Sequence, residues 1–129
     1  MTRPARIHAR TVIEFVAASY GLPPAALTGD CRRSVVVRPR QFAMYAIRQL
    51  CPHLSLNLIG RALGGRDHTT ILHGLRKVEG QIAQGEFGDD LARLEAWFDQ
   101  AYLEDRIEEA EQRLARLKAI RQTVQQVSA

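Results

Sequence analysis

The strongest constraint on the fold comes from residues 55–78, where two helical patterns meet at a pair of glycines. Ser55 is placed as a helix N-cap, and the apolar residues after it recur at spacings of three and four. Gly64-Gly65 favours a helix end, because glycine readily adopts the left-handed conformation. Asp67 is typical of the N-cap of a second helix, since its carboxylate can accept a backbone N–H. The apolar positions of the two helices are Leu56, Ile59, Leu63, Ile71, Leu75, Val78 and Ile82.

The second helix of this pair has a polar and basic face opposite its apolar one. That face carries Arg66, His68, Thr69, His73, Arg76 and Lys77. Two helices joined by a tight glycine turn, the second polar and basic, form the pattern of a helix-turn-helix. The N-terminal end of such a helix enters the major groove, where threonine methyls suit thymine and arginine suits guanine. The sequence therefore predicts an all-α protein with a helix-turn-helix DNA-binding domain.

The charge is divided unevenly along the chain. Residues 1–88 hold twelve Arg and Lys against five Asp and Glu, a net charge of +7, whereas residues 89–129 hold six against nine, a net charge of −3. The basic part coincides with the helix-turn-helix, as binding to phosphate requires. Solubility alone is the alternative explanation of the basic residues, but nearly all of them are arginines, which favours bidentate recognition of phosphate and guanine.

Two motifs carry a resemblance to a known family. They are the run Gly64-Gly-Arg-Asp-His-Thr-Thr-Ile-Leu-His73, preceded by Ile59-Gly60, and the upstream segment Arg38-Pro-Arg-Gln-Phe-Ala-Met-Tyr45. Over roughly residues 8–84 the chain resembles the C-terminal DNA-binding domain (domain IV) of the DnaA replication initiators. The resemblance implies a Trp-repressor-like helix-turn-helix that binds double-stranded DNA at DnaA-box-like sites.

The resemblance also implies roles for individual residues. The base-contacting set is Arg66, Asp67, His68, Thr69 and Thr70. A basic loop before the next helix reaches the minor groove through Arg32 or Arg33, and the sequence leaves open which of the two inserts. The phosphate contacts are Arg38, Arg40, Arg48 and Lys77. Arg40 and Arg48 lie eight residues apart on one face of a helix predicted to begin at Pro39. His73 is predicted either to face DNA or to be a partly buried, hydrogen-bonded histidine.

The pattern predicts three parts along the chain. Residues 1–10 form a basic N-terminal arm, residues 11–85 the DNA-binding domain, and residues 89–127 an amphipathic helical extension, after three glycines that interrupt the helix. In the extension, apolar residues recur at alternating spacings of four and three, the seam of a coiled coil. They are Leu103, Ile107, Ala110, Leu114, Leu117 and Val124. The extension is predicted either to form a homodimer, which we favour, or to fold back on the domain as a hairpin.

Several function classes find no support in the sequence. There is no Gly-x-x-x-x-Gly-Lys-[Ser/Thr] loop, so no nucleotide or other cofactor is expected. His68 and His73 are five residues apart, not at the spacing of a zinc pair, and Cys31 and Cys51 do not make a metal motif, so no metal site or enzyme is expected. Without an apolar run of about 18 residues or a signal core, the chain is expected to be cytoplasmic, nucleoid-associated and free of membrane spans.

The predicted function is sequence-specific binding of double-stranded DNA that regulates replication initiation or transcription. The alternative from another class is a protein-interaction adaptor that acts through the C-terminal coiled-coil-like helix, with a vestigial DNA motif. The presence of residues 66–70 together argues against that alternative.

Overall fold

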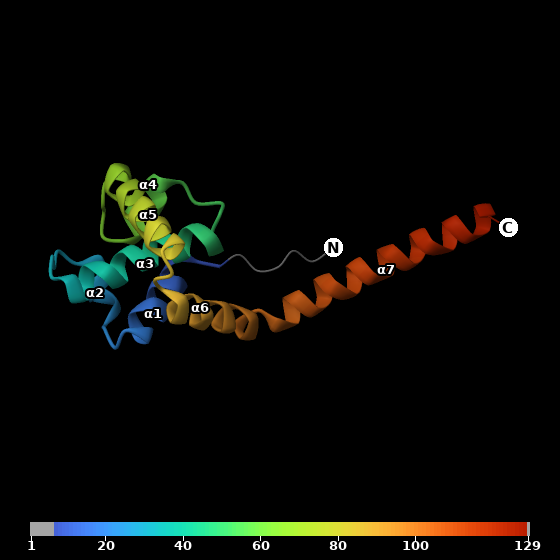
Figure 1. Ribbon diagram of the computed structural model, residues 1–129, viewed down its shortest axis with the longest axis horizontal. Coiled ribbons are helices and arrows are strands. Elements are labelled where there is room, and N and C mark those ends of the chain that lie inside the picture. The colour runs from blue at the N-terminus through green and yellow to red at the C-terminus, as the bar shows by residue number, and fades with distance from the viewer. Residues whose placement is uncertain (1–6, 129) are drawn as a thin grey trace. The chain divides into compact units, whose positions relative to one another are not determined.

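The computed structural model describes residues 7–128, which form seven α-helices and no strand. The fold is therefore all-α, as the sequence predicts. The helices are α1 (Ala9–Ser19), α2 (Pro24–Thr28), α3 (Ser34–Leu50), α4 (Leu56–Ala62), α5 (His68–Ala83), α6 (Gly88–Ala101) and α7 (Leu103–Ser128) (Figure 1). They divide between two compact units, Arg6–Leu94 and a second that contains Glu95–Ala129.

The unit Arg6–Leu94 is built around α3. Figure 1 shows α3 in the middle of this unit, with α1 on one side and α4 and α5 on the other. The apolar faces of these helices meet in one core, because each helix repeats apolar residues at spacings of three and four. The largest fully buried side chains are those of Phe42, Leu27, Met44, Ile47, Ile59, Leu63, Ile71, Val12, Val16, Val78 and Cys51. α5 carries three of the five predicted base contacts, at residues 68–70, and is fixed against α3 and α4.

α3 is longer at its N-terminus than the sequence suggests. The prediction that this helix begins at Pro39 is wrong, because α3 begins at Ser34 and holds Pro39 inside it. Pro39 has no N–H to donate to the carbonyl of Val35, so α3 lacks one helical hydrogen bond at this point. Val36 is buried and anchors the additional turn. The basic loop before α3 is correspondingly shorter, and Arg33 becomes the N-cap residue.

The N-terminal arm predicted for residues 1–10 does not extend to residue 10. Ile7 is buried, its carbonyl accepts a hydrogen bond from the Cys51 thiol at 3.2 Å, and α1 begins at Ala9. Burial raises the pKa of the Cys51 thiol, which favours the protonated form that donates this bond. The predicted arm over residues 1–10 is therefore corrected at its C-terminal end. Arg3 and Arg6 of that arm lie outside the described residues.

The extension is two helices rather than one, since α6 and α7 are separated at Tyr102. The first residues of α6 belong to the unit Arg6–Leu94, in which Leu94 is buried, so this unit continues past the predicted boundary at residue 85. Within the second unit, Tyr102 packs its ring 5.4 Å from that of Phe98. Arg106 forms an ion pair with Asp99 across the break. Among the described helices, none is both long and apolar enough to cross a membrane.

Candidate nucleic-acid interface

The helix-turn-helix is formed by α4, a glycine turn and α5. The Ser55 hydroxyl accepts the backbone N–H of Leu58 at 3.2 Å and so caps α4 as predicted. Gly64 and Gly65 have φ values of 85° and 82°, a region that glycine adopts without strain. The N–H groups of Gly65 and Arg66 then both bond to the carbonyl of Gly60, at 3.0 and 2.9 Å. These bonds fold the turn back onto α4 and set the direction in which α5 begins.

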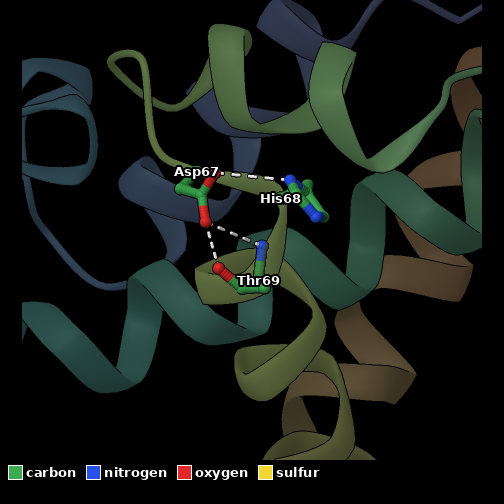
Figure 2. A network of polar contacts seen from close by, with 3 residues as sticks. All are labelled: Asp67, His68 and Thr69. Carbon is green, nitrogen blue, oxygen red and sulfur yellow. Dashed lines mark hydrogen bonds and ion pairs between the residues drawn. The ribbon is translucent and has the colours of Figure 1, made fainter.

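The N-terminus of α5 is organised by the carboxylate of Asp67 (Figure 2). One oxygen accepts the backbone N–H of Thr69 at 3.3 Å and also the Thr69 hydroxyl, while the other lies 3.3 Å from Nδ1 of His68. The two hydrogen bonds from Thr69 are the main reason that the pKa of Asp67 lies below its usual value. The predicted N-cap is confirmed, and the same carboxylate orients the two residues that follow it.

The first two turns of α5 present a polar surface. The side chains of Asp67 and His68 are 64% and 55% exposed, and Thr69, Thr70 and His73 are exposed as well. His73 is therefore not the partly buried histidine that was the alternative prediction. A depression of about 310 Å³ between α3 and α5 is lined by the candidates Arg40, Arg66, Thr70 and Lys77 and by His73, and a smaller one beside it by Arg38 and Lys77. Arg32, Arg33 and Arg48 are exposed but lie outside these depressions.

Arg40 does not have the exposure that a phosphate contact needs. It is 5% exposed, and its guanidinium donates to four backbone carbonyls at 2.8 to 3.1 Å. The carbonyls are those of Ala26, Leu27, Gly29 and Cys31. Burial lowers the pKa of Arg40, and the neighbouring Arg66 guanidinium lowers it further. The prediction that Arg40 contacts phosphate is therefore corrected, because this side chain holds the end of α2 and the following loop against α3.

Arg66 is the second arginine directed inward. It is half-buried, and its guanidinium donates to the carbonyls of Leu63 and Gly29. A base contact from Arg66 would require breaking both bonds. In this structure Arg66 thus belongs with Arg40 in the support of the turn rather than with the exposed residues of α5. The carbonyl of Gly29 accepts from both arginines and joins the two.

Arg38 is held at the edge of the same surface. Its guanidinium pairs with Glu86 at 3.2 Å and lies 4.0 Å from the ring centroid of Phe87. Phe87 is 4% exposed, stacks on Phe42 at 5.2 Å and has a φ of 64°. Phe87 lies between the predicted domain, which ends at residue 85, and the predicted extension, which begins at residue 89. An aromatic residue among glycines was the signal that this segment packs on the core.

A compact all-α unit whose glycine turn leads into a capped, polar and exposed helix is a helix-turn-helix DNA-binding domain. The family model described as "Bacterial dnaA protein helix-turn-helix" matches residues 9–78, and the chain belongs to this family. The matched region is the helix-turn-helix, not a catalytic domain.

The chain is also similar to individual proteins over this region. Over 80 residues, or 61% of this chain, it is 48% identical to the chromosomal replication initiator protein DnaA of Cereibacter sphaeroides. Over 75 residues, or 58% of the chain, it is 50% identical to the protein of the same name from Thermus thermophilus. The chain covers 17% of the length of each of these relatives. A crystal structure described as a DNA replication initiation factor superposes with a TM-score of 0.64 at 31% identity, covering 73% of this chain and 29% of the other.

Proposed function

We propose that this protein binds double-stranded DNA in a sequence-specific manner at DnaA-box-like sites. The observation that carries the proposal is the N-terminus of α5, where Asp67 holds His68 and Thr69 in fixed positions on an exposed turn (Figure 2). A recognition helix enters the major groove with this end, and its first side chains reach the base edges. We assign base contacts to Asp67, His68, Thr69 and Thr70.

The backbone contacts are proposed for the exposed arginines and for Lys77. Arg38, Arg48 and Lys77 are the phosphate candidates that remain after Arg40 is assigned to the fold. To bind phosphate, Arg38 must give up its ion pair with Glu86. The free-energy cost is small, because both side chains are about two-fifths exposed. Arg32 and Arg33 are exposed just before α3 and are the candidates for the minor groove.

The proposed biological role is regulation of replication initiation or of transcription, exerted by occupying DNA. The protein would act by binding and not by catalysis, and it would work at the nucleoid. The curated relatives of the matched region are named chromosomal replication initiators, which supports a role in replication initiation rather than in transcription. Their further activities are not assigned to this chain, which spans 17% of their length.

Thr69→Ala tests base recognition. The substitution removes a methyl and a hydroxyl from the exposed first turn, and the Asp67 carboxylate still caps the backbone N–H of residue 69. We expect binding to a duplex that carries a DnaA box to weaken by about 1–3 kcal/mol, with little change on a scrambled duplex. Fluorescence anisotropy with both labelled duplexes, over a salt series, measures the difference.

The matched control is Thr123→Ala, which removes the same groups from an exposed position on α7. It should leave both affinities unchanged. Equal losses on the two duplexes for Thr69→Ala would remove Thr69 from base recognition. Wild-type binding that is weak on both duplexes and vanishes with salt would leave only the electrostatic attraction and contradict the proposed function.

We also propose that the protein forms a homodimer through residues 89–127. α7 supports this proposal, because none of its described residues is buried and it exposes a row of large apolar side chains. Sedimentation equilibrium of the full chain checks the proposal. A mass of two chains is expected at micromolar concentration, and a mass of one chain throughout would contradict it.

A further inference from the structure

The apolar row on α7 has a regular spacing. Leu114, Leu117 and Val124 are 53%, 57% and 58% exposed and stand on the seam that begins at Leu103 and Ile107. A single helix cannot bury this seam, whereas a second helix with the same repeat can. The seam alone does not determine whether the second helix runs parallel or antiparallel to α7.

We propose that α7 pairs with α7 of a second copy of this chain in antiparallel orientation. The inference rests on the proposed homodimer and adds to it the direction and the register of the two helices. Three properties of α7 support it: the charge of its two halves, the matching of residue sizes along the seam, and the charges that flank the seam.

The two halves of α7 carry opposite charge. Residues 103–112 contain five acidic residues and one basic residue, whereas residues 113–128 contain four basic residues and no acidic one. Two parallel helices would place the acidic halves together and the basic halves together. Two antiparallel helices place each acidic half beside a basic half, which is favourable along the whole pair.

Size matching fixes the register. With Leu114 opposite Leu117 of the second copy, Ile107 comes opposite Val124. Ala110, the smallest residue of the seam, then lies opposite Arg121, the residue that interrupts the apolar repeat. A long side chain thus meets a small one, as close packing requires. In a parallel pair the two Arg121 side chains would face each other.

The residues beside the seam agree with this register. Glu111 and Lys118 occupy the same flanking position of successive heptads, one residue C-terminal to Ala110 and Leu117. In the antiparallel register Glu111 lies beside Lys118 of the second copy, and the symmetry of the dimer makes this contact twice. In a parallel pair Lys118 would instead lie beside Arg113 of the second copy, a repulsive contact.

The arrangement has a consequence for DNA binding. In this register the two Leu103 residues stand about 38 Å apart, at 1.5 Å of helix rise per residue. Each DNA-binding unit is connected to its α7 at that end. The two units are therefore attached at opposite ends of the helix pair, which suits two separate sites rather than one contiguous site.

Charge reversal tests the orientation. In the full chain, Lys118→Glu places a second carboxylate beside Glu111 of the other copy, and Glu111→Lys places two lysines together. We expect each variant to raise the dimer dissociation constant by about tenfold at low salt. An equimolar mixture of the two variants should restore dimers at wild-type affinity, because each heterodimer regains both attractive contacts. Sedimentation equilibrium measures all of these constants.

The control is Arg116→Glu, which changes the net charge by the same amount as Lys118→Glu. Residue 116 points away from the seam, so this variant should change the dimer dissociation constant much less. Tighter dimerisation of Lys118→Glu would indicate the parallel pair, in which the introduced carboxylate meets Arg113, and would overturn the inference. So would a dimer that neither variant changes. A monomeric wild type would instead overturn the proposed homodimer itself, so the two failures are distinguishable.

Discussion

Replacing Arg40 with methionine should lower the free energy of unfolding by about 3–5 kcal/mol. The methionine would fill much of the same space, but the carbonyls of Ala26, Leu27, Gly29 and Cys31 would lose their donor. A buried acceptor left without a partner costs about 1–3 kcal/mol, and those near the surface regain water. Urea unfolding followed by circular dichroism measures the change.

Arg40→Lys should recover only part of this loss. Lysine keeps the charge, but its three donors lie on one nitrogen and cannot reach carbonyls spread over residues 26–31. Arg48→Met is the matched control on the same helix, since Arg48 is exposed and makes one long contact, to the carbonyl of Leu54 at 3.5 Å. It should change the stability by less than about 0.5 kcal/mol.

The same variants decide between the structural role of Arg40 and the phosphate contact that the sequence suggested. If Arg40→Met retained full stability and lost affinity equally on specific and scrambled duplexes, with a smaller salt slope, Arg40 would be a phosphate contact after all. With the structural role, the folded fraction of the variant should bind both duplexes with nearly the wild-type salt slope.

Arg40 also shows where reading the sequence reaches its limit. Its partners are backbone carbonyls 9 to 14 residues away, and every residue has a carbonyl, so no residue type marks them. The caps at Ser55 and Asp67 were predictable because each is a local bond between a characteristic side chain and an N–H two or three residues on. Bonds that depend on how the loop meets α3 have no such signature.

Pro39 and Phe87 show the same limit in the helix boundaries. Proline is most frequent in the first turn of a helix, which predicted a start at Pro39, but the burial of Val36 outweighs that preference and extends α3 to Ser34. The glycines around residue 85 correctly mark a helix end, with Gly85 at a φ of 89°. They do not reveal that Phe87 returns to the core and stacks on Phe42.

Gly60→Ala should lower the free energy of unfolding by about 2–4 kcal/mol, although alanine favours helices. A Cβ at residue 60 would lie 2.0 Å from the carbonyl oxygen of Arg66, so the turn that now bonds to the Gly60 carbonyl would have to move. α5 begins at His68, two residues after Arg66, so a shift of this turn moves the recognition helix. We therefore also expect weaker binding to a DnaA-box duplex than the loss of folded protein alone would cause.

The control for Gly60→Ala is Gly80→Ala in α5, where nothing lies within 4 Å of an added Cβ. There the gain in helix propensity is unopposed, so the variant should be more stable by about 0.5–1 kcal/mol. Urea unfolding of both variants measures the change in stability. Fluorescence anisotropy of the same samples with a labelled DnaA-box duplex measures the change in DNA affinity, so the two effects are separated. Equal stability of Gly60→Ala and wild type would mean that the turn relaxes freely. The close contact between Gly60 and Arg66 would then not be what sets the position of the recognition helix.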